Sequence, residues 1–194
     1  MRKLTYFVAS TIDGFIATPE RDDPTGHSAG FFLMEGDHFP GMFADYPDLL
    51  PTVAQEMFGV AGPNRAFDTV VEGRVSYEGG LKAGITNAYT HLRHIVFSTT
   101  LTSPDATVEV VGTDPAAKIR ELKAEDGLGI WLVGGGTLAY SLRDEIDELI
   151  VKLHPSALGS GAPMFDGPFS PQAFTLVDLV RYESGVVILK YAKR

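Results

Sequence analysis

The chain has 194 residues and a formal net charge of −9, from 16 Lys and Arg against 25 Asp and Glu. This length suits one domain whose core needs no metal or disulfide, and the chain has no cysteine. The acidic balance argues against a protein that binds nucleic acid or an anionic membrane, because both partners require a basic surface. A small anionic ligand stays compatible, since a few local donors hold one.

The first apolar run, residues 4–9, is too short for a signal peptide. No run approaches the ~20 apolar residues that a membrane helix needs. We therefore expect a cytoplasmic protein. The five histidines show no metal-ligand spacing, so the sequence predicts no metal site.

Short apolar runs rich in β-branched and aromatic residues predict buried strands. The runs cover residues 4–9, 69–71, 95–97, 107–111, 130–133, 149–153, 174–180 and 186–191. The sequence Glu183-Ser184-Gly185 between the last two runs predicts a tight hairpin turn.

Two longer helices are predicted over residues 48–58 and 114–127, each with an aspartate as N-cap and a glycine at its end. Short helices are predicted after Gly73 and Gly136. Strands that alternate with helices and close on a hairpin predict an α/β sheet, mostly parallel with an antiparallel edge.

One stretch, residues 22–64, contains no Lys or Arg and holds seven acids that account for −7 of the net charge of −9. It is also rich in aromatic residues, glycine and proline. One interpretation is an irregular surface excursion with its own hydrophobic cluster, which the sequence alone favours. The other is a lid or pocket wall over a flat aromatic ligand. We treat residues 1–194 as a single domain with this insertion at about 19–64.

Four segments at the ends of predicted strands contain candidate binding or catalytic residues. The triple glycine 134–136 follows one strand and opens a helix, where backbone N–H groups can face a phosphate, although a turn that needs glycine for packing fits as well. Gly73-Arg74 opens another helix, and Arg suits phosphate through its bidentate fork. Ser98 and Thr99 suit ribose or phosphate, or simply a turn. Asp13-Gly14 indicates a turn first, and Asp13 could also orient a substrate.

In their order along the chain these segments resemble the dihydrofolate reductase-like superfamily, and within it the branch of the reductase domain of bacterial riboflavin biosynthesis. The similar segments are 10–17, 68–78, 95–101, 133–138, 146–149, 155–165 and 185–191. The resemblance implies a mixed, mostly parallel central sheet of about eight strands with flanking helices and a C-terminal antiparallel hairpin. It also implies NADPH bound across the carboxyl ends of the strands, and a homodimer.

Carried over residue by residue, the resemblance implies three groups of cofactor contacts. Residues that hold phosphate or ribose would be Gly73, Arg74, Ser76, Ser98 and Thr99. Residues along the pyrophosphate would be Gly134, Gly135, Gly136, Thr137 and Leu138, and those around the nicotinamide Ala9, Ile16 and Ala17.

The chain departs from this family pattern at two functional points. Glu72 replaces the apolar residue that usually precedes Gly-Arg. The acidic residue that the folate enzymes carry on their first helix has no assignable match, which argues against dihydrofolate as substrate. The deaminase half of the bifunctional riboflavin enzyme is absent, because neither H-x-E nor C-x-x-C occurs.

The sequence therefore predicts an NADPH-dependent reductase of a C=N or C=O bond in a small flat heterocycle, similar to a pteridine or a pyrimidine ribosylamine. A water or a carboxylic acid must supply the proton, and the candidate acids are Asp13, Glu72 and Asp48. The alternatives are a non-catalytic NADPH- or nucleotide-binding protein on the same fold, and an interaction protein that uses the acidic aromatic stretch.

Overall fold

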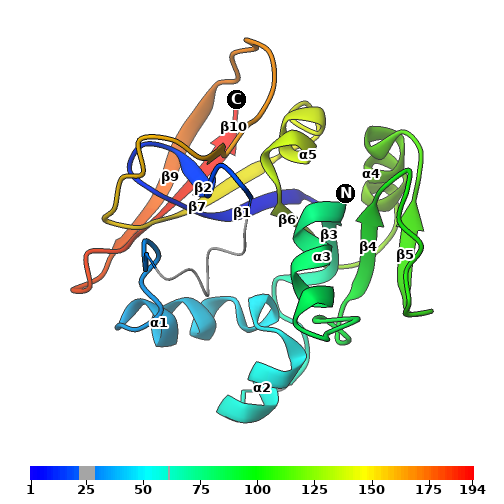
Figure 1. Cartoon of the computed structure of the whole chain (residues 1–194), viewed down its shortest axis with the longest axis horizontal. Helices are drawn as coiled ribbons and strands as arrows, with labels where there is room; N and C mark the ends of the chain where they lie inside the picture. Colours follow the sequence, from blue (N-terminus) through cyan, green and yellow to red (C-terminus); the bar gives the residue numbers. More distant parts are fainter. Residues whose placement is uncertain (22–28, 61) are drawn as a thin grey trace.

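The computed structural model describes residues 1–21, 29–60 and 62–194 and centres on one eight-stranded sheet (Figure 1). The strands are β1 (Leu4–Ser10), β3 (Phe67–Gly73), β4 (Arg93–Phe97), β5 (Val108–Val111), β6 (Gly129–Gly134), β7 (Glu148–Leu153), β9 (Phe174–Arg181) and β10 (Val187–Lys193). Their order across the sheet is β5-β4-β3-β6-β1-β7-β10-β9. In this order across the sheet, the six strands β5, β4, β3, β6, β1 and β7 run parallel to one another. Strand β10 pairs antiparallel with both β7 and β9. The predicted α/β sheet, its strands and its C-terminal hairpin are confirmed.

The helices are α1 (His38–Asp45), α2 (Thr52–Phe58), α3 (Arg74–Lys82), α4 (Pro115–Ala124) and α5 (Gly136–Ser141), with a 3-10 turn, η1 (Pro47–Leu49). Asp114 caps α4 as predicted, because its carboxylate accepts the Ala117 N–H at 3.0 Å. Helices after Gly73 and Gly136 are confirmed as well. A separate two-stranded sheet, β2 (Phe15–Ala17) with β8 (Ala162–Pro163), has no counterpart among the predicted strands.

The predicted N-cap role of Asp48 is wrong. Pro51 occupies the N-cap position of α2, and Asp48 lies earlier, in η1. The Asp48 carboxylate instead accepts the consecutive backbone N–H groups of residues 65–67, at 2.6–3.1 Å. Three donors at the start of β3 satisfy this buried carboxylate better than one N-cap bond, which explains the outcome. The predicted stop at Gly59 is confirmed, with φ +64°.

Helix α1 was not among the predicted helices, since it contains Pro40 and Gly41, which are poor helix formers. Proline is tolerated there because it stands in the first turn. Met42 is buried, and Phe39 and Phe43 pack against the same hydrophobic cluster as the sheet residues Phe7 and Trp131. Tertiary packing therefore holds a helix that local preference disfavours.

The two faces of the sheet carry two different covers. On one face, side chains of the first core cluster, such as Leu132 and Val151, meet Ile119 and Leu122 of α4 and Ala139 of α5. The alternate strand residues point to the other face, where α1 and η1 lie (Figure 1). The core thus follows the period-two alternation of the strands.

Hydrogen bonds tie the stretch before α2 to this second face. The Asp37 carboxylate accepts the backbone N–H groups of Glu183 and Ser184 in the hairpin turn, at 2.8 and 3.1 Å. Ser156 Oγ donates to the Phe31 carbonyl at 2.6 Å. These contacts attach the acidic stretch to the C-terminal strands. Asp22, Asp23 and His27 of the same stretch lie outside the described residues.

Two histidines are fully buried where this stretch meets β7. His154 Nδ1 accepts the Leu33 backbone N–H at 3.0 Å, and the rings of His38 and His154 are 5.9 Å apart. Burial and, to a smaller extent, the nearby positive charge of Lys152 together lower the pKa of His154 to about 3. Burial also lowers the pKa of His38. Both rings are therefore neutral at pH 7, as structural histidines.

We expect Asp48→Ala to lower the free energy of unfolding by roughly 3 kcal/mol, because three main-chain donors lose the buried, charged acceptor that they share. Urea denaturation measures this change. The control is Asp45→Ala, an exposed aspartate in α1 whose carboxylate the structure leaves in solvent. Equal stability of the two variants would contradict the assigned role of Asp48.

Stability is expected to fall as the pH drops below about 6.5, because the buried His154 has a lowered pKa and protonation favours the unfolded chain. His154→Asn keeps an acceptor for the Leu33 N–H but does not titrate. Urea midpoints at about pH 7 and about pH 4.5 should differ less for this variant than for the wild type. Identical pH slopes would show that His154 does not contribute.

Candidate active site

Glycines line the carboxyl edge of the parallel strands. Strands β3 and β6 end side by side, with Glu72 in register with Gly134. A Cβ built on Gly73 would lie 3.8 Å from the Gly134 carbonyl oxygen and 3.9 Å from Leu138 Cβ. A Cβ on Gly134 would lie 3.7 Å from Ser76 Oγ. The structure thus brings together four of the predicted cofactor residues at the start of α3 and α5.

Gly135 and Gly136 differ in what surrounds them. No atom lies within 4 Å of a Cβ on Gly135, so its backbone is open to a ligand. A Cβ on Gly136 would collide with the Pro163 carbonyl oxygen, and the Gly136 carbonyl accepts the Asp166 N–H at 3.1 Å. Gly136 therefore serves packing, as one of the two interpretations has it, while the phosphate role of the open Gly135 stays a prediction.

The predicted polar contacts already have partners within the chain. Arg74 Nη1 donates to both carboxylate oxygens of Glu78 at 2.8 and 2.9 Å, on the surface of α3. Thr137 Oγ1 donates to Asp166 Oδ2 at 3.1 Å. A guanidinium has five N–H donors, so Arg74 keeps donors for a phosphate.

Ser98 and Thr99 follow β4, next to β3 in the sheet. Ser98 Oγ accepts the backbone N–H groups of Thr100 and Leu101 at 3.2 and 3.0 Å, which is the turn role considered for it. Thr99 is exposed. The hydroxyl proton of Ser98 stays available to a ligand at this edge.

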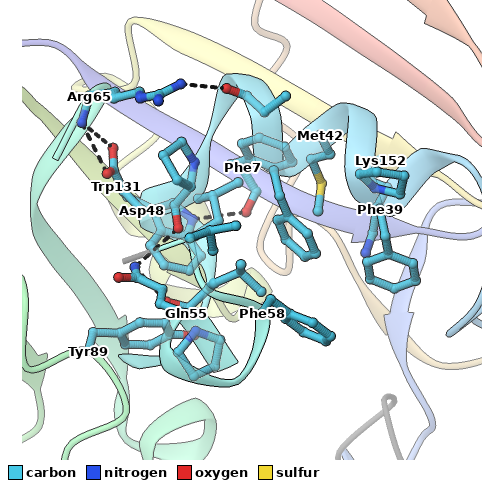
Figure 2. A pocket seen from close by; sticks show the side chains of 18 of the residues that line it. Phe7, Phe39, Met42, Asp48, Gln55, Phe58, Arg65, Tyr89, Trp131 and Lys152 are labelled. Carbon is cyan, nitrogen blue, oxygen red and sulfur yellow. Dashed lines mark hydrogen bonds between the residues drawn. The ribbon is translucent and has the colours of Figure 1, made fainter. Parts of the chain in front are cut away.

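An open cavity of about 1510 Å³ lies between the second face of the sheet and the acidic stretch (Figure 2). Phe7, Ala9, Trp131, Val133 and Lys152 line it from β1, β6 and β7. The opposite wall comes from residues 34–63 and is mostly apolar, with side chains that include Met34, Phe39, Phe43 and Phe58. The stretch without basic residues therefore forms a wall of a pocket.

The predicted nicotinamide contacts divide between two places. Ala9 lines the cavity, and Val133 joins the cavity to the glycine edge because Gly134 follows it in β6. Ile16 packs against the first core cluster, and Ala17 is buried in the pairing of β2 with β8. Ile16 and Ala17 are outside the cavity lining.

Two of the three predicted proton donors are engaged away from the cavity lining. Asp13 is exposed and accepts Thr11 Oγ1–H at 2.6 Å and the Gly159 N–H at 2.7 Å, which lower the pKa of its carboxyl. Asp13 is therefore ionised at neutral pH and ties two loops together. Glu72 is buried on β3, 2.7 Å from His94 Nε2.

Asp48, the third predicted donor, lines the cavity, but its oxygens are the acceptors for residues 65–67 described above. All three carboxylates thus have structural partners. Their catalytic role stays a prediction.

Lys152 is the cavity residue that the sequence analysis missed. It stands within the apolar run 149–153, on the same face of β7 as Ile150, and the pattern of that run predicts only a buried strand. Burial lowers the pKa of its ammonium to about 8. The one sequence signal for a functional residue here is a basic residue inside an apolar strand. Only the fold shows that this residue lies at a cavity.

Other kinds of site find no support in the described ranges. Among residues 1–21, 29–60 and 62–194, no group of three His, Asp or Glu side chains is arranged to hold a metal ion. None of the helices in those ranges is both long and apolar enough to span a membrane.

Comparison with known proteins matches residues 2–188 to the family described as the RibD C-terminal domain. The uncharacterized protein YwjB of Bacillus subtilis (strain 168) is 30 % identical over 167 residues, which cover 84 % of this chain and 83 % of that protein. YyaP of the same organism is 30 % identical over 98 residues, 50 % of this chain and 52 % of that protein.

Two solved structures share the fold. A protein of Shewanella sp. PV-4 named for riboflavin biosynthesis superposes with a TM-score of 0.69 at 21 % identity, covering 100 % of this chain and 99 % of that chain. A diaminohydroxyphosphoribosylaminopyrimidine deaminase/5-amino-6-(5-phosphoribosylamino)uracil reductase of Thermotoga maritima gives 0.63 at 16 % identity, covering 100 % of this chain and 57 % of that chain. The match over residues 2–188 shows that the chain belongs to the RibD C-terminal domain family, and the two solved structures have the same fold.

Proposed function

We propose that this protein is an NADPH-dependent reductase that transfers a hydride to a C=N or C=O bond of a small flat heterocycle. The observation that carries the proposal is the meeting of the open glycine edge with the apolar cavity, where Val133 leads into Gly134. A dinucleotide along the edge would direct its nicotinamide toward Ala9, and a flat substrate fits the aromatic cavity beside it. The reductase half of the Thermotoga maritima enzyme suggests a pyrimidine ribosylamine-like substrate.

The residues at the edge fit the charged part of NADPH. The Cβ position of Gly135 is open, and α3 begins at the edge with free backbone N–H groups and the positive end of its dipole. Arg74 adds a guanidinium to the same helix start. Gly73, Ser76, Gly134 and Gly135 would hold the phosphates through backbone and hydroxyl donors.

When bound, NADPH supplies the hydride from nicotinamide C4. The chain's own part is to hold the two flat rings together and to exclude water from their contact, through Phe7, Phe39 and Trp131. The proton comes from water at the open side of the cavity, since the three candidate carboxylates are engaged in structural hydrogen bonds.

We expect Gly135→Asp to weaken NADPH binding by about tenfold or more, because a new carboxylate would stand beside the phosphates. Gly135→Asn is the matched control of equal size without the charge. Both should fold, because no atom lies within 4 Å of the added Cβ and φ there is −92°. Calorimetric titration with NADPH measures the affinity. Equal affinities of the two variants would show that the phosphates do not bind at this edge.

Turnover separates a reductase from a protein that only binds the nucleotide. NADPH oxidation should be detected with at least one member of a panel of pterins, pyrimidine ribosylamines and quinone-like acceptors, and Arg74→Ala should slow it by about tenfold at limiting NADPH. Arg120→Ala, an exposed arginine of α4, is the control. Tight NADPH binding without oxidation of any acceptor would favour the non-catalytic alternative.

We propose further that the protein is a homodimer that pairs through β9. This strand lies at the edge of the sheet, and Leu176, Val177 and Leu179 are 48 %, 54 % and 52 % exposed. An apolar edge strand of this length invites association unless it is covered. A second copy of the chain would cover it with the same strand.

Leu179→Lys is expected to shift the protein from dimer to monomer, because the new charge would be buried in the interface. Sedimentation velocity measures the mass in solution. Leu128→Lys, at a leucine that is 37 % exposed and far along the chain from β9, is the control and should leave the dimer intact. A monomeric wild type would refute the proposed interface.

A further inference from the structure

Lys152 enters the cavity from the sheet. On β7 it is in register with Ala9 of β1 and with Ile188 of β10. Side chains in register on neighbouring strands point to the same face, so Lys152 lies beside Ala9, at the cavity. Its Nζ is 5.4 Å from the centre of the Phe39 ring, and Figure 2 shows the two side chains together at one end of the cavity.

The ammonium has no anionic partner in the described part of the chain. Burial is the cause of its lowered pKa, and no hydrogen bond or ion pair from Nζ offsets it. The fully buried basic side chains are different, since Arg2 is paired with Asp68 and Lys123 with Asp147 at 2.7 Å. An unpaired cation in an apolar cavity costs free energy, which an anionic ligand would recover.

The groups around Lys152 make its surroundings positive or neutral rather than negative. His38 on α1 and His154, which follows β7, are neutral near pH 7, and the Lys152 charge lowers the pKa of each. From β1 and β6 the cavity receives uncharged side chains. The acidic side chains in the lining are the exposed Glu35 and Asp48, whose oxygens already bind backbone N–H groups.

We propose that Lys152 determines substrate specificity by binding an anionic oxygen attached to the flat ring that the cavity accepts. The ring would lie against Phe39, with its carboxylate, enolate or deprotonated imide oxygen at Nζ. The position beside Ala9 places this charge on the ring that is reduced, not on a remote substituent. This inference rests on the proposed reductase function for the identity of the cavity as the substrate site.

Two probes of equal shape test the proposal without cofactor. They are 2-naphthoate, which carries the anionic oxygen, and 2-naphthamide, which is neutral. Trp131 is the single tryptophan and lines the cavity, so its indole N–H signal in a proton–nitrogen NMR spectrum reports binding there. We expect naphthoate to bind about tenfold or more tightly than naphthamide.

Variants of Lys152 test whether this lysine causes the preference for naphthoate over naphthamide. Lys152→Met should weaken naphthoate binding by about tenfold or more and change naphthamide binding by less than about twofold, while Lys152→Arg should keep the preference. Lys190→Met is the matched control, because Lys190 is a half-buried lysine of β10 outside the cavity lining. It should leave both affinities unchanged. Urea denaturation should find Lys152→Met at least as stable as the wild type, because it removes an unpaired buried charge.

The pH dependence gives an independent readout. The ammonium form binds the anion, and the pKa of Lys152 in the free protein is about 8. Naphthoate affinity should therefore decrease as the pH rises above about 8 in the wild type, and stay constant over the same range in Lys152→Arg, whose guanidinium does not titrate. Naphthamide affinity should show no such decrease.

Equal loss of both probes in Lys152→Met would assign the lysine to packing and overturn the proposal. A naphthoate affinity no higher than that of naphthamide, or no shift of the indole signal by naphthoate, would overturn it as well. Titration with NADPH reports on the reductase function separately. An anion preference that depends on Lys152 in a protein without NADPH affinity would leave this inference standing and refute the proposed cofactor.

Discussion

Burial of both faces of a parallel sheet is the constraint on which the rest of this structure depends. Strands such as β1 and β6 alternate large apolar residues to both sides, so each face needs a cover. Helices α4 and α5 close one face with regular packing. The other face is covered by α3, whose Tyr77 packs on β4 and β5, and by a turn-rich stretch that touches the sheet at α1 and η1. The cavity forms beside the contacts of this stretch.

The acidic character of that stretch has a structural use. Asp37 and Asp48 accept backbone N–H groups in distant segments, and so attach the stretch to the hairpin turn and to the start of β3. The charge that the sheet brings to the cavity is positive, from Lys152, for which no anionic partner is found in the described part of the chain. The net charge of the chain therefore reflects the acidic stretch and does not predict the charge in the pocket. Backbone N–H groups stabilise the individual carboxylates of this stretch by hydrogen bonds.

Strand positions, the hairpin and the cap of α4 could be predicted because they follow from local patterns. Apolar alternation marks strands, and Asp114 before a proline marks a helix start. The motif order also placed Gly73 and Gly134 at one edge, since parallel strands end together. Helix α1 could not be predicted, because Pro40 and Gly41 oppose helix formation locally and only contact with the sheet outweighs them.

The family, the sheet and the glycine edge could be predicted from local patterns, because they depend on spacing within short segments. The partners of several polar side chains, in contrast, depend on the tertiary structure. Asp48 binds the start of β3 instead of capping α2, and Glu72 meets His94 across two strands. Lys152 faces a cavity whose opposite wall comes from residues 89 to 118 positions earlier in the chain. Such contacts join segments far apart in the chain, and no local pattern encodes them.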